Sequence, residues 1–279
     1  MNVRELLLAT TLLFVGSGAA MADADAAKAA MTEAAIQAMK AVTAKEMVAH
    51  ATIPDALIPM VEDYLQDLYS DEQVVALVAS GLYNHVPDEM QDAPDAAPAL
   101  VRSYGATLVD DFDRDGVAFL PFAAQRQYLQ MQIDILTSMS PEDCVDRLLM
   151  RQKSDEEMLA VELGVIQEKG LDYAKTWLDL KSAAVKALAS ATAEGRHARD
   201  LLSKDDYATG QRVIETTYMA MADEDPRIEE SYAAYNRPED AAAAPLCVGH
   251  LLPDMAALSL DGAIGDIAVK VVSTHDTYF

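Results

Sequence analysis

The chain has 279 residues and a formal net charge of −25 at pH 7, with 46 acidic side chains against 21 lysines and arginines. This acidity repels phosphate backbones and anionic membrane surfaces, so it argues against nucleic-acid binding and leaves solubility, cationic partners or metal ions as explanations. Hydrophobic residues make up 51% of the chain, which is ample for a packed core and argues against disorder over most of its length.

Residues 1–22 have the pattern of a secretory signal peptide. Arg4 lies in a short polar start, and residues 6–15 form an apolar core that is too short to span a bilayer. Ala20 and Ala22 place small residues at the two positions that a signal peptidase reads. We therefore predict cleavage after Ala22 and a mature, soluble protein that is exported to the periplasm without a transmembrane anchor.

An uncleaved N-terminal anchor is the alternative interpretation of this segment. Glu5 offsets the charge of Arg4, so the polar start is only weakly basic. Signal peptides normally begin with a positively charged stretch, so an uncleaved anchor stays an alternative. Gly16 and Gly18 interrupt the apolar run after Val15, which favours a cleaved peptide with a new N-terminus at Asp23.

Helix-start signals recur along the mature chain. A serine followed three residues later by an acid or a glutamine can form a capping box at the start of a helix. Gly170 and Gly195 stand at predicted helix ends, where a residue with left-handed backbone angles is favoured. The four candidate boxes begin at Ser70, Ser140, Ser154 and Ser203. One of the apolar rows with helical spacing comprises Leu171, Ala174, Leu178, Val185 and Leu188, with Trp177 on its flank. We predict an all-α protein, either a multi-helix bundle or a helical array of antiparallel amphipathic helices.

The predicted helices fall into two groups. Residues 23–86 form an N-terminal helical segment, and the acidic, proline-containing stretch 87–98 is typical of a linker. The main helical domain then covers residues 99–279. Its run 263–272 contains enough valine to permit a strand, but no partner strand is evident, so helix is favoured.

An acidic stretch near the start of the main domain resembles half of a calcium loop. Asp111, Asp113 and Asp115, followed by Gly116, match the first half of the EF-hand pattern and could supply oxygen ligands to Ca²⁺. The twelfth position of such a loop is Phe122, where a bidentate glutamate is needed. We therefore predict an acidic turn, with Ca²⁺ binding as the alternative and no other cofactor.

Cys144 and Cys247 are the two cysteines of the chain. An even count in an oxidising compartment favours a disulfide, and both residues lie on apolar helical rows that would face a common core. We predict a bridge between two helices, with two buried thiols as the alternative. His250 lies one turn after Cys247, but no second pair of ligands completes a zinc site.

Signatures of catalysis are missing from the sequence. It contains no zinc-hydrolase motif, nucleophile elbow, phosphate-binding glycine loop or dinucleotide fingerprint, so no residue is nominated as catalytic or cofactor-binding. We predict a non-enzymatic binding or interaction role with a protein or small-molecule partner. The alternatives are a periplasmic enzyme with dispersed acid/base residues and an acidic calcium-responsive structural protein. A pocket that gathers several titratable side chains with shifted pKa values would favour the enzyme, and a wide apolar groove without such groups would favour the binder.

Overall fold

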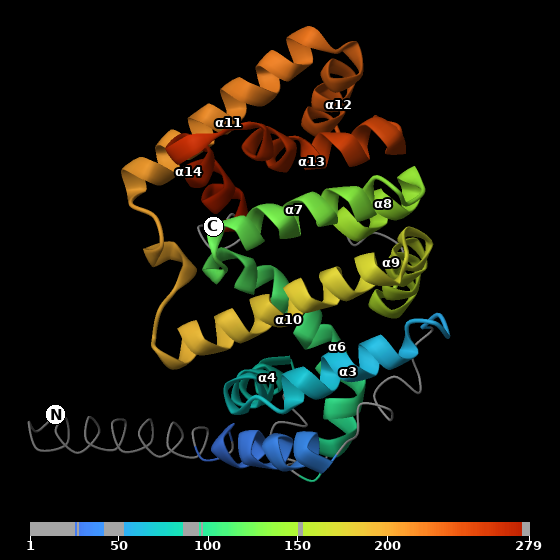
Figure 1. Ribbon diagram of the computed structural model, residues 1–279, viewed down its shortest axis with the longest axis vertical. Helices are drawn as coiled ribbons and strands as arrows, with labels where there is room; N and C mark the ends of the chain where they lie inside the picture. The colour runs from blue at the N-terminus through green and yellow to red at the C-terminus, as the bar shows by residue number, and fades with distance from the viewer. Residues whose placement is uncertain are drawn as a thin grey trace, which may run out of the picture.

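The computed structural model describes residues 26, 28–41, 53–85, 95, 97–149 and 153–274, and within these ranges the regular elements are all helical (Figure 1). The helices are residues 28–41, α3 (Ile58–Tyr69), α4 (Glu72–His85), α6 (Ala97–Gly116), α7 (Phe122–Leu136), α8 (Pro141–Leu149), α9 (Asp155–Lys169), α10 (Leu171–Ala193), α11 (Lys204–Glu224), α12 (Pro226–Asn236), α13 (Ala243–Ser259) and α14 (Gly262–Ser273), with short 3-10 turns η2 (Val117–Phe119) and η3 (Ala198–Asp200). This confirms the predicted all-α class and the helix over residues 263–272.

Two of the sequence predictions concern residues that the structure does not describe. The signal peptide, residues 1–22, lies outside the described ranges, as does most of the linker 87–98, whose last two residues begin α6. Both stay predictions. None of the described helices combines the length and the hydropathy that a membrane-spanning helix requires.

Serine caps begin three of the four helices for which they were predicted. Ser154 forms a complete capping box at the start of α9. The hydroxyls of Ser140 and Ser203 each accept the backbone N–H three residues on, at 3.1 and 3.0 Å. The prediction for Ser70 is wrong, because the carboxylate of Asp71 accepts the first free N–H groups of α4 instead.

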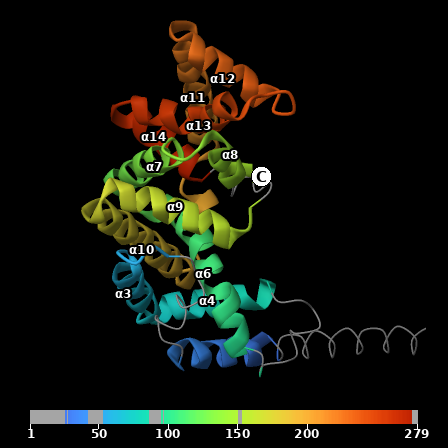
Figure 2. The ribbon, with the colours of Figure 1, turned by 90° about the vertical axis from the view of Figure 1, so that its right-hand side faces the viewer.

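The helices stack along the long axis of the molecule. Helix α10, the longest described helix with 23 residues, contacts α3, α4, α6, α7 and α9. The N-terminal helices lie at one end and α11–α14 at the other, with α7–α10 between them, as two perpendicular views show (Figures 1 and 2). Gly170, at φ 105°, provides the turn between α9 and α10, and Gly195, at φ 68°, follows α10, as predicted.

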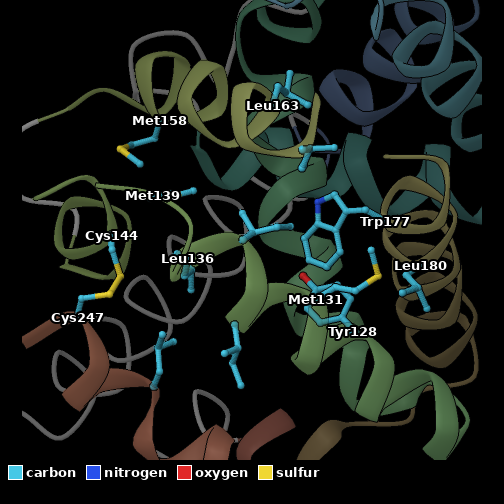
Figure 3. Packing of buried hydrophobic residues seen from close by; sticks show 14 of the residues in the cluster. Tyr128, Met131, Leu136, Met139, Cys144, Met158, Leu163, Trp177, Leu180 and Cys247 are labelled. Carbon is cyan, nitrogen blue, oxygen red and sulfur yellow. A yellow bond between two sulfur atoms is a disulfide. The ribbon is translucent and has the colours of Figure 1, made fainter. Parts of the chain in front are cut away.

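A disulfide joins two of the helices in the middle of the stack. Cys144 of α8 and Cys247 of α13 are bonded, with their Cα atoms 5.7 Å apart and a sequence separation of 103 (Figure 3). Both are buried in the largest apolar cluster, which α7, α8, α9, α10 and α13 share. The predicted helix-to-helix bridge is therefore confirmed.

The buried face of α10 matches the predicted row in part, because Ala174 and Val185 of that row are buried. Leu171, at the start of the row, is 52% exposed, whereas Trp177 is only 4% exposed. Lys181 is buried one turn after Trp177, and Ala184 and Val185 continue that face. The face of α10 that the stack buries thus contains a tryptophan and a lysine.

Candidate functional site

The acidic stretch 111–116 forms the end of α6 rather than the predicted turn, so that prediction is wrong. Successive residues of a helix are about 100° apart, so Asp111 and Asp115 share one side while Asp113 points away from them. Asp113 is 2% exposed, and Asp115 is on the surface. The three carboxylates therefore do not converge, and within the described ranges no group of three or more His, Cys, Asp or Glu side chains could hold a metal ion.

Asp113 instead takes part in a buried ion pair. Lys181 Nζ of α10 lies 2.7 Å from Asp113 Oδ2, and both side chains are less than one-tenth exposed. The hydroxyl of Tyr128, on α7, donates a hydrogen bond to Asp113 Oδ1 at 2.7 Å. Because Oδ1 accepts a hydrogen bond and Oδ2 faces the ammonium group, the carboxylate is stabilised in the interior and ties three helices together.

Glu162 of α9 is the second buried carboxylate of this cluster. The indole Nε1 of Trp177 donates to Glu162 Oε1 at 3.1 Å. Arg147 Nη2 of α8 lies 3.5 Å from Glu162 Oε2, and Lys181 Nζ lies 3.9 Å from Oε1. Lys181 thus lies between two carboxylates, and the cluster links α6, α7, α8, α9 and α10.

Two aromatic rings pack beside these charges. The ring centroids of Tyr128 and Trp177 are 4.8 Å apart, and Figure 3 shows the two rings side by side between α7 and α10. Lys181 Nζ lies 5.6 Å from the Trp177 ring centroid, which is within range of a cation–π interaction. Both rings are only 4% exposed, so the charges beside them lie in the interior, where electrostatic contacts are stronger than in water.

This cluster forms one wall of a cavity of about 330 Å³. Its lining comes from α6, α7, α8, α9, α10, α12, α13 and α14, together with Val117 of η2 and Thr274 after α14. The charged and polar side chains among the lining residues include Asp113, Arg114, Asp115, Gln132, Arg147, Glu162, Lys181, His250, Asp254 and Ser273. Distant parts of the sequence therefore present charged, polar and aromatic groups to one partly open cavity.

Helices α12, α13 and α14 supply another part of the lining. His250 packs edge-on against Tyr235, with ring centroids 5.1 Å apart, and Asp254 follows His250 by one helical turn. The Ser273 hydroxyl oxygen is buried and makes no hydrogen bond to the described part of the chain. A buried hydroxyl of this kind is available to a water molecule or to a polar ligand.

The sequence patterns do not point to the residues at the centre of this cluster. Lys181 and Glu162 belong to no motif, and the helical row places Trp177 only on its flank. One available signal was Lys181 itself, which stands four residues from both Trp177 and Val185 on an apolar helical face. A lysine at such a position is rarely buried unless it is paired.

No protein-family model, no curated protein and no solved structure was found to match the chain. Its function is therefore argued from the chemistry of the cavity.

Proposed function

We propose that this protein is an exported, non-enzymatic binding protein that holds a small polar molecule in the cavity between α6, α7, α10 and α13. The observation that carries the proposal is the cavity itself. Its volume of about 330 Å³ lies within the range of ligand pockets, and it gives room for roughly ten water-sized groups. Charged, polar and aromatic side chains converge on it, and polar groups placed in a pocket fix the orientation of a ligand and provide specificity.

The arrangement of the cluster also favours binding. Asp113, Glu162 and Lys181 are held by one another and by Tyr128 and Trp177, so little side-chain freedom remains to be lost when a ligand enters. The disulfide joins α8 to α13, and both helices contribute to the lining. A wall fixed before binding lowers the entropic cost of association.

The single tryptophan of the chain gives a direct test. Trp177 lines the cavity, so selective excitation of its fluorescence reports on occupancy without a label. We expect a screen of amino acids, polyamines, sugars and dicarboxylic acids to reveal a compound that changes the emission saturably and raises the midpoint of thermal unfolding. Failure of every compound to change either signal would contradict the proposal.

Two variants separate cavity binding from surface binding. Ser273→Leu places a larger side chain at the cavity wall and should abolish the fluorescence response to the compound. Ser190→Leu makes the same change on α10, at a half-buried position that does not line the cavity, and should leave binding unchanged. Equal loss in both variants would count against the cavity.

A second candidate is an enzyme with dispersed acid/base residues. His250 and Asp254 favour it, because they lie one turn apart on α13 and both line the cavity with Ser273. The compound found in the screen should be incubated with the protein and followed by NMR. Chemical conversion that His250→Gln abolishes, while binding persists, would establish the enzyme; an unchanged spectrum supports the binding protein.

Export to the periplasm rests on the sequence of residues 1–22. Mass analysis of the N-terminus of exported protein should give Asp23 as the first residue. A protein that retains residues 1–22 in the membrane fraction would contradict this part of the proposal.

A further inference from the structure

We infer that the cavity binds a small organic cation, an amine or a quaternary ammonium compound. The inference rests on the proposed binding function and adds the chemical class of the ligand. Three independent features support it: the charges of the lining, its aromatic rings and the field of the whole chain.

Acidic side chains are in excess around the cavity. Four carboxylates line it, against three permanently cationic groups. Lys181 pairs with Asp113, and Arg147 lies against Glu162. Arg114, the third cation, lies 3.5 Å from a further carboxylate outside the lining, that of Asp111. With histidine neutral, the lining therefore has a formal charge of −1, which favours a cationic ligand over an anionic one.

Three aromatic rings line the cavity. Tyr128 and Trp177 are buried, whereas Tyr235 is 42% exposed. The negative faces of such rings attract ammonium groups. One ring already has a cation next to it, because Lys181 Nζ lies 5.6 Å from the centroid of Trp177. The cavity thus offers both kinds of group that recognise an organic cation.

The charge of the whole chain also favours a cationic ligand. A formal net charge of −25 produces a negative potential that raises the local concentration of cations and lowers that of anions. Screening by salt weakens this attraction, so the affinity for a cation should fall as ionic strength rises.

The test compares probes of different charge on the full mature chain, with Trp177 fluorescence and calorimetry as readouts. The probes are choline and putrescine as cations, glutarate as the anion and sorbitol as the neutral compound. At least one cation should bind saturably and about tenfold or more tighter than glutarate and sorbitol. Raising NaCl from about 20 to about 500 mM should weaken that binding.

Matched variants show whether the cation binds in the cavity or on the acidic surface. Asp254→Asn removes one carboxylate of the lining and should weaken binding of the cation several-fold, and Ser273→Leu should abolish it. Asp240→Asn removes an exposed carboxylate that does not line the cavity and should change nothing. Cation binding that survives Ser273→Leu would belong to the acidic surface and would overturn the inference.

The remaining outcomes distinguish this inference from the proposed function. Tighter binding of glutarate or sorbitol than of either cation would overturn the cationic class while the binding function stands. The same holds if choline and putrescine fail but the broader screen yields a non-cationic ligand. If no probe and no compound of the screen binds, both the inference and the proposed function are wrong.

Discussion

Lys181 Nζ lies 2.7 Å from Asp113 Oδ2, and this ion pair joins α10 to α6 where both side chains are buried. Removing two charges from water is costly, and their attraction offsets that cost only when further hydrogen bonds complete the site. Tyr128 supplies such a bond to Asp113, and Glu162 lies on the other side of Lys181. The stability of the centre of the molecule therefore depends on this cluster remaining complete.

The first prediction concerns Lys181. Lys181→Met leaves two buried carboxylates without the cation between them and should lower the free energy of unfolding by about 3–5 kcal/mol. Lys186→Met on the same helix is the matched control. The Lys186 side chain is 34% exposed and pairs with Asp67, which is 52% exposed, so its loss should cost about 0–1 kcal/mol. Chemical denaturation followed by circular dichroism measures both changes.

A double variant tests the reason for the loss. Replacing both partners, in Lys181→Met with Asp113→Leu, removes one of the uncompensated buried charges and should recover part of the stability lost in Lys181→Met. If the double variant is less stable than Lys181→Met by the full cost of Asp113→Leu alone, the two side chains act independently and the electrostatic account fails.

The second prediction compares two helical glycines. A Cβ added to Gly116, at the end of α6, would collide with the backbone carbonyl of Ala184 in α10. Gly116→Ala should therefore separate these helices and destabilise the fold by about 1–3 kcal/mol. A Cβ at Gly164, within α9, meets nothing within 4 Å, so Gly164→Ala should stabilise by about 0.5–1 kcal/mol. The midpoint of thermal unfolding should fall for Gly116→Ala and rise for Gly164→Ala. A shift in the same direction for both variants would contradict the prediction.

The third prediction concerns the disulfide. The Cys144–Cys247 bridge closes a loop of 103 residues, so its removal in the double serine variant should lower the free energy of unfolding by about 2–5 kcal/mol. Because α8 and α13 both line the cavity, the same variant should bind the cavity ligand more weakly. Denaturation with and without reductant, together with Trp177 fluorescence titration, measures the two effects. Unchanged stability and binding would show that packing alone holds these helices.

Local signals were enough to predict the helices but not the inward face of α10. Capping at Ser154 and the positive φ of Gly170 depend on neighbouring residues, and the structure confirms both. The partners of Lys181 are different, because Asp113 and Glu162 lie on α6 and α9 and meet it only after the chain has folded. An apolar row alone predicted that Leu171 faces the core, whereas it is 52% exposed.

The spacing of the acidic residues 111–116 was likewise not enough to predict their structure. Its spacing matched a calcium loop, a match that assumes a bend in the chain. Val101, Leu108 and Val109 are buried earlier on α6, and the helix continues from them through the acids. Helical geometry then turns Asp113 toward Lys181 and Tyr128, away from its neighbours. The disulfide could be predicted because only one pairing of two cysteines exists.

The last prediction is a loss of stability at alkaline pH. Burial raises the pKa of Tyr173 to about 12, and the nearby charge of Asp134 adds to this, while burial also raises the pKa of Tyr69. In the unfolded chain a tyrosine loses its proton near pH 10. Above about pH 10 the folded state therefore retains protons that the unfolded state releases, so the free energy of unfolding falls as pH rises toward 12. Below pH 10 the contribution of both groups is fully present.

Two variants check this origin by denaturation at pH 7 to 12. Tyr69 has a buried hydroxyl that makes no hydrogen bond in the described structure, so Tyr69→Phe should leave stability at pH 7 nearly unchanged and flatten the decline above pH 10. Tyr173 donates to the carbonyl oxygen of Met131 at 3.2 Å, so Tyr173→Phe should cost about 1 kcal/mol at pH 7 and flatten the same decline. Because a phenylalanine has no proton to release, a decline of unchanged steepness in both variants would assign the alkaline transition to other groups.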